Sequence, residues 1–73
     1  MEINARDGKM YEVSTAPVGG AHEVKYHGTL VGTFVLKKRE TIVSVKSELI
    51  TESTLTDIAD RFVDKGGAPM GML

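Results

Sequence analysis

The sequence contains no cysteine and no tryptophan, and it has only two tyrosines, two phenylalanines and two histidines. Without cysteine, neither a disulfide framework nor a thiolate zinc site can supplement the core of so small a chain. A chain of 73 residues buries only about 60% of the surface that it exposes when unfolded, so it can hold one compact core and no second domain. Packing of apolar side chains must therefore supply the stability.

Long hydrophobic runs are also absent. No stretch approaches the roughly 20 apolar residues that cross a bilayer, and residues 1–10 mix charged with apolar side chains instead of forming a hydrophobic signal segment. At 41% hydrophobic and 26% charged residues, the composition is typical of a folded globular protein. We therefore expect a cytoplasmic protein that makes no membrane contact.

A large excess of positive charge is missing as well. The formal net charge of −1 argues against bulk electrostatic attraction to nucleic acid, because domains built for that purpose usually have a pI above about 9. The charges are unevenly distributed: residues 1–46 hold seven bases and five acids, whereas the residues from 47 onward hold two bases and five acids. The molecule should therefore present two oppositely charged surfaces.

Turn signals divide the first two-thirds of the chain into short strands. Asp7-Gly8 favours a type I′ hairpin turn, and His27-Gly28 can form a second turn. The expected strands are 2–6, 9–14, 22–26, 29–36 and 41 to about 46. Short connections predict an antiparallel meander, because a parallel pair needs a crossover of about a dozen residues or more. The loop 15–21, which contains Pro17, is expected to separate two halves of this sheet.

The longest predicted strand contains a glycine on its apolar face. Alternation places Leu30, Gly32 and Phe34 on the same side of the strand 29–36. The missing side chain at Gly32 leaves room for a bulge or a close neighbour. We expect another element to pack over this glycine.

One helix is expected over residues 54–65. Apolar residues recur there with helical period, at Leu55, Ile58, Ala59, Phe62 and Val63. Ser53 or Thr54 can cap its start, and Gly66 can end it. The fold class is therefore α+β: residues 1–65 form a single domain in which this C-terminal helix packs on a small antiparallel sheet of about four to five strands. Residues 66–73, with three glycines and a proline, are expected to form a flexible tail.

The sequence contains no recognisable catalytic, cofactor-binding or metal-binding motif. His22 and His27 are five positions apart, which puts them on opposite faces of a strand, so they cannot share a metal ion. One face of the predicted helix carries five charged residues, which we interpret as solvent-exposed: Asp57, Asp60, Arg61, Asp64 and Lys65. We expect a protein that is no enzyme and uses no cofactor.

Basic side chains form the strongest candidate for a binding site. The triplet Lys37-Lys38-Arg39 is the densest positive feature, and on a hairpin tip it could meet phosphate or an acidic protein surface. A solubilising turn is the alternative. The full candidate set for partner binding is Lys25, Lys37, Lys38, Arg39 and Lys46. Tyr11 and Tyr26 are the candidate aromatic anchors of an interface, with a place in the core as the alternative.

In length and overall make-up, the chain resembles the small RNA-polymerase-binding transcription regulators of lytic Xanthomonas phages. The resemblance implies a phage protein in the host cytoplasm that binds RNA polymerase, inhibits initiation and acts in antitermination, and it assigns no contact residue. One alternative is DNA binding by a three-stranded sheet, because the order of sheet and helix is similar to that of the arm-binding domains of phage integrases; the five basic residues would then contact DNA. The other alternative is an inhibitor of a host defence complex.

Overall fold

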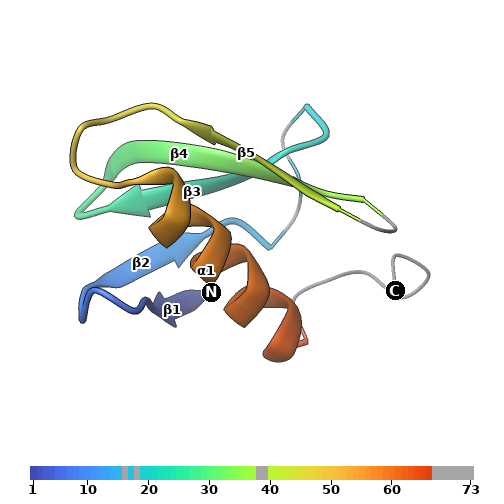
Figure 1. The fold of residues 1–73 in the computed structure, drawn as a ribbon, viewed down its shortest axis with the longest axis horizontal. Coiled ribbons are helices and arrows are strands. Elements are labelled where there is room, and N and C mark those ends of the chain that lie inside the picture. Colours follow the sequence, from blue (N-terminus) through green and yellow to red (C-terminus); the bar gives the residue numbers. More distant parts are fainter. Residues whose placement is uncertain (16, 18, 38–39, 67–73) are drawn as a thin grey trace.

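The computed structural model describes residues 1–15, 17, 19–37 and 40–66. Five antiparallel strands form one sheet in chain order, and a single helix crosses one face of it (Figure 1). The elements are β1 (Glu2–Asn4), β2 (Met10–Val13), β3 (His22–Tyr26), β4 (Thr29–Leu36), β5 (Thr41–Val45) and α1 (Glu52–Asp64). The predicted α+β meander with a C-terminal helix is confirmed. Of the predicted tail, residues 67–73 lie outside the described residues.

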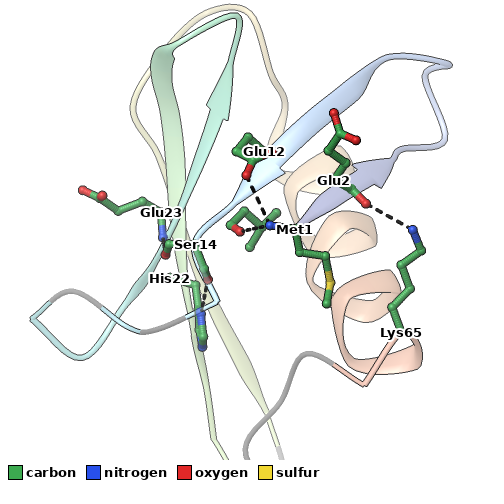
Figure 2. Close-up of polar contacts among 8 residues, drawn as sticks. Met1, Glu2, Glu12, Ser14, His22, Glu23 and Lys65 are labelled. Carbon is green, nitrogen blue, oxygen red and sulfur yellow. Dashed lines mark hydrogen bonds and ion pairs between the residues drawn. The ribbon is translucent and has the colours of Figure 1, made fainter.

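The loop 15–21 does not divide the sheet. β2 and β3 pair directly, with Glu12 opposite Lys25, and the Ser14 N–H donates to the Glu23 carbonyl at 3.0 Å where the strands leave the loop. The Ser14 hydroxyl also accepts from the Glu23 N–H at 2.9 Å (Figure 2). The loop separates the two halves of the sheet along the chain only, and the flanking strands pair with each other, as the predicted meander requires.

The β1–β2 hairpin is closed by a different turn from the predicted type I′. Gly8 has φ +82°, but Asp7 does not have positive φ. The Gly8 N–H donates to the Ala5 carbonyl at 3.0 Å, and the Ala5 N–H donates to the Lys9 carbonyl at 2.9 Å. This pattern is a three-residue loop with glycine in the left-handed region. The type I′ conformation is found instead at His27-Gly28, where φ is 50° and 82°.

The helix and one face of the sheet enclose the core. The buried apolar side chains are Ile3, Ala5, Tyr11, Val13, Val24, Val31, Phe34, Leu36, Ile50, Leu55, Ile58, Ala59 and Phe62. The Phe34 and Phe62 rings meet edge-on at 5.5 Å between centroids. His22 is buried against both rings, and its Nδ1 lies 2.8 Å from the Ser14 carbonyl oxygen. The hydrogen bond allows a polar ring to occupy the core.

A β-bulge in β4 decides which of its residues face the core. Val24 pairs with Gly32, but the next residue, Lys25, pairs with Leu30, so β4 contains one extra residue. That residue, Val31, is fully buried, whereas Leu30 is 36% exposed on the other face. The prediction that Leu30 shares the face of Gly32 is wrong, because a bulge interrupts the strict alternation of side chains. A bulge is one of the two possibilities that the missing side chain of Gly32 leaves open, and the structure contains it.

The helix comes closest to the sheet at Gly32. A Cβ atom at this position would lie 2.7 Å from Cδ2 of Leu55 and 3.0 Å from the carbonyl oxygen of Ser44. The expected neighbour over Gly32 is therefore the first apolar side chain of the helix stripe. Leu55 packs directly on the backbone of β4 because the glycine has no side chain.

The helix begins earlier than predicted. Thr51, with extended backbone angles, is the N-cap, and its hydroxyl accepts from the Thr54 N–H at 3.2 Å. Ile50 precedes the cap and is buried, as expected where an apolar residue anchors the entry to a helix. The predicted cap at Ser53 or Thr54 is therefore wrong. The predicted stop is confirmed, because Gly66 has φ +79° and its N–H donates to the Val63 carbonyl.

Polar side chains of α1 cover the outer edge of β1. Even-numbered residues of β1 point their backbone groups away from β2, since the odd-numbered Met1 accepts from the Val13 N–H. Three helix positions and the C-cap residue, each separated by four residues, reach this edge. Ser53 accepts from Arg6 Nη1, Asp57 accepts from the Arg6 N–H, Arg61 donates to the Asn4 carbonyl, and Lys65 donates to the Glu2 carbonyl, at 3.0 to 3.1 Å (Figure 2 shows the Lys65 contact).

The spacing of these helix side chains matches the spacing of the outward backbone groups of β1. Four helical residues rise about 6 Å and two strand residues about 6.6 Å, so each turn of α1 meets the next outward group of β1. Asp57 is half-buried and also accepts from Arg61 Nε at 2.8 Å. The interpretation of the charged helix face as solvent-exposed therefore holds for Asp60, Arg61, Asp64 and Lys65, although Arg61 and Lys65 also bond to β1, and it is wrong for the half-buried Asp57.

Substitution of Gly32 tests the close approach of helix and sheet. We expect Gly32→Ala to lower the free energy of unfolding by about 1–3 kcal/mol, because the new methyl group overlaps Leu55 and the β5 backbone. Leu55→Ala alone should cost about 2–5 kcal/mol. The loss in the double variant should be smaller than the sum of the two single losses, because removal of the Leu55 side chain makes room for the new methyl group. Urea unfolding of all four proteins measures this, and full additivity would contradict the contact.

Substitution of Asp57 tests the cover of β1. Asp57→Ala should lower the free energy of unfolding by about 1–2 kcal/mol, because the Arg6 N–H and Arg61 lose their acceptor. Asp60→Ala is the matched control: it removes the same charge from the same helix at an exposed position, and should change stability by less than about 0.5 kcal/mol. Equal losses in thermal or urea unfolding would show that the Asp57 contacts contribute nothing.

Candidate functional site

The face of the sheet opposite α1 is uncovered within the described part of the chain (Figure 1). Strand register places alternate residues on this side, and we call them the open face: Glu2, Asn4, Met10, Glu12, Glu23, Lys25, Leu30, Thr33, Val35, Ile42 and Ser44. Three large apolar side chains are exposed there, Met10 at 46%, Leu30 at 36% and Ile42 at 43%. Charged residues stand between them.

The bulge in β4 places an apolar residue on the open face, beside the β3–β4 turn. Leu30 lies opposite Lys25 of β3, which in turn lies opposite Glu12 of β2. Glu12, Lys25 and Leu30 therefore lie next to one another in one row across the open face. The sequence prediction missed this row because Leu30 appeared to belong to the core.

The structure does not bring the predicted basic residues together. Lys25 and Lys46 are exposed at the same end of the sheet, where the Lys46 N–H donates to the Val31 carbonyl at 2.9 Å. Lys37 is exposed at the opposite end, where its N–H donates to the Glu40 carbonyl in the β4–β5 turn. The length of β5, about 17 Å at 3.3 Å per residue, separates the two ends. Lys38 and Arg39 lie outside the described residues, so the triplet stays a prediction.

A hollow lies on the open face near the β3–β4 turn. It is lined by Glu2, Met10, Tyr11, Glu12, Lys25, His27 and Gly28. Glu2 and Glu12 stand directly opposite each other on β1 and β2. The Met1 ammonium group lies 3.3 Å from Oε1 of Glu12 and donates to the Val13 carbonyl at 2.9 Å (Figure 2). That cation offsets the repulsion between the two glutamates.

The tyrosines contribute to the core more than to the open face. Tyr11 is 1% exposed, and its ring centroid lies 5.3 Å from that of Tyr26, which is half-buried against the core. The Lys9 ammonium group lies 5.6 Å from the Tyr26 ring centroid. The alternative of a core position is therefore the correct one for Tyr11.

The Tyr11 hydroxyl is joined to the β1–β2 turn by a short hydrogen bond. It donates to Oδ2 of Asp7 at 2.7 Å. Burial is the largest cause, and this hydrogen bond the second largest, of a Tyr11 pKa above its usual value of 10.0. Desolvation opposes ionisation of Asp7, but the hydrogen bonds from Tyr11 and from the Lys9 N–H outweigh it and leave the pKa of Asp7 below its usual value of 3.8.

The histidines occupy unrelated positions. His22 lies in the core, and His27 lies in the β3–β4 turn beside the Tyr26 ring. Over residues 1–15, 17, 19–37 and 40–66, no three histidine, aspartate or glutamate side chains form a group that could hold a metal ion. The helix of this part of the chain is also too short and too polar to cross a membrane.

Comparison with known proteins identifies no relative: no protein-family model, no curated protein and no solved structure matches the chain. The open face therefore has to be interpreted from its own chemistry. It offers exposed apolar side chains among charges of both signs, an arrangement that suits binding to a protein surface.

The Asp7–Tyr11 bond should make stability depend on pH in two ranges. The lowered pKa of Asp7 contributes stability above its usual pKa of 3.8, and this is lost as the pH falls below that value. The raised pKa of Tyr11 contributes stability below pH 10 that is lost at higher pH. Tyr11→Phe should flatten both losses, as measured by urea unfolding across pH. Tyr26→Phe is the control and should keep the profile of the original protein.

Proposed function

We propose that this protein is a small non-catalytic regulator that binds a host protein complex, bacterial RNA polymerase first of all, through the open face and thereby inhibits or modulates transcription. The observation that carries the proposal is the exposure of Met10, Leu30 and Ile42 on a sheet that has no cover on that side among the described residues. Burial of apolar surface stabilises a protein by about 25 cal/mol per Å², and a chain this small gains nothing from apolar surface that stays exposed to water. Such residues gain that energy when a partner covers them.

The chemistry of the open face favours a protein partner. Protein interfaces combine apolar anchors at their centre with a polar rim. Leu30 supplies an apolar anchor, and Lys25 and Glu12 supply charges of both signs in the same row of the sheet. RNA polymerase is chosen as the partner on the resemblance in size and organisation to phage transcription regulators.

DNA is a weaker candidate for the same surface. Glu2, Glu12 and Glu23 share the open face with Lys25 and would be repelled by the phosphate backbone. The predicted bases do not gather into one patch, since Lys37 and Lys46 lie at opposite ends of β5. An inhibitor of a host defence complex would use the open face in the same way with another partner.

Substitution of Leu30 tests the proposal. Purified bacterial RNA polymerase should bind the immobilised protein in the presence of nuclease, and Leu30→Glu should weaken binding at least about tenfold. The fold should persist, because Leu30 lies outside the core. Leu49→Glu is the matched control: Leu49 is a leucine that is 52% exposed and does not lie on the open face.

Promoter-dependent transcription provides the functional measurement. The original protein and Leu49→Glu should change transcript yield to the same extent, and Leu30→Glu should not. No binding to polymerase, or equal loss in both variants, would contradict the proposal. In a pull-down from bacterial lysate with the same immobilised protein, recovery that disappears with nuclease would indicate DNA binding, and nuclease-resistant capture of a defence complex in place of polymerase would indicate the defence inhibitor.

A further inference from the structure

The two edges of the sheet differ in how they are protected. Within the described residues, β5 is the last strand and pairs only with β4. Its even-numbered residues direct their backbone groups towards β4, since the neighbouring Lys46 N–H donates to the Val31 carbonyl and the Glu40 carbonyl accepts from Lys37. The backbone groups of Thr41, Val43 and Val45 therefore point away from the sheet.

Among the described residues, the β5 edge has none of the usual features that prevent strand pairing. The segment Thr41–Val45 contains no proline and no charged residue, and three of its five residues are valine or isoleucine. Its register with β4 is unbroken from Gly32 opposite Val45 to Leu36 opposite Thr41. By contrast, α1 covers the β1 edge with polar side chains. An uncovered, regular and β-branched edge is a template for another strand.

We propose that two copies of this protein pair through β5 in antiparallel orientation, with the two-fold axis at Val43. Thr41 of one copy then faces Val45 of the other, and the outward groups form about six backbone hydrogen bonds. The same register sets Glu40 opposite Lys46 of the second copy, and Lys46 opposite Glu40 of the second copy. Both residues are exposed and flank the strand.

The charges select this register and identify a second copy as the occupant. A shift by two residues leaves an outward residue of β5 without a pair, and it sets Lys46 against Ile42 or Glu40 against Ser44 instead of joining the opposite charges. Opposite charges that face each other across strands stabilise the pair, whereas like charges destabilise it. The strand is therefore complementary to itself in one arrangement.

Pairing would also cover apolar surface. Ile42 is 43% exposed and Val45 40% exposed, and both would lie against the added strand. Because the two-fold axis is perpendicular to the sheet, both helices would lie on one side of a ten-stranded sheet and both open faces on the other. The dimer does not depend on the proposed binding of polymerase.

Charge reversal and its rescue test the dimer. Sedimentation equilibrium of the full chain over a range of concentrations should show a monomer–dimer equilibrium. Glu40→Lys should weaken the dimer at least about tenfold, because like charges then face each other twice. Lys46→Glu should have the same effect, and the double variant Glu40→Lys, Lys46→Glu should restore dimerisation. Asp60→Lys, an equal change of charge on the outer side of α1, is the control and should leave the equilibrium unchanged.

Hydrogen exchange locates the interface. The amides of Val43 and Val45 should exchange more slowly as the protein concentration rises, whereas the Ser44 amide, already directed towards β4, should not change. A monomer at every concentration, an unaffected dimer in Glu40→Lys, or a double variant that fails to recover would each overturn the proposal. Binding of a different protein to the β5 edge of such a monomer would identify that protein as the occupant instead.

Discussion

Burial of one sheet face beneath a single helix is the interaction on which the rest of this structure depends. α1 has 13 residues and is therefore about 20 Å long, enough to cross the sheet once. It supplies Leu55, Ile58, Ala59 and Phe62 to the core. It packs closely on β4 at Gly32, which has no side chain. The described residues contain no second helix to cover the other face. The open face is therefore exposed because the single helix packs on the core face.

The helix also covers the β1 edge of the sheet with polar side chains, which explains the difference between the two sheet edges. Its polar stripe follows β1, because four helical residues and two strand residues have nearly the same length. The side chains that perform this task, Asp57, Arg61 and Lys65, appeared from the sequence to be ordinary solvent-exposed charges. A helix can align its polar stripe with only one edge. The opposite edge, β5, keeps its outward backbone groups unmet by any described element.

Much of the fold could be predicted from local patterns, but the candidate site could not. The helical spacing of Leu55, Ile58 and Phe62 indicated the buried face, and Gly66 indicated the helix end. The N-cap at Thr51 was missed because several hydroxyl residues compete at that point in the sequence, and only the buried Ile50 decides between them. Leu30 and Val31 exchanged faces at a bulge that no periodicity reveals. The predicted partner-binding set was chosen by residue type alone. The distances between these basic residues depend on strand register, which the sequence pattern does not give.

The hydrogen bond between Lys65 and Glu2 joins residues 63 positions apart. Contacts of such sequence separation carry the largest loop-closure entropy, so the β1 edge should join the helix late in folding, after the hairpins have formed. The ends of the described fold consequently lie side by side. A short linker could join them, and the chain could then be opened at another loop, such as 15–21, to give a circularly permuted protein with the same contacts.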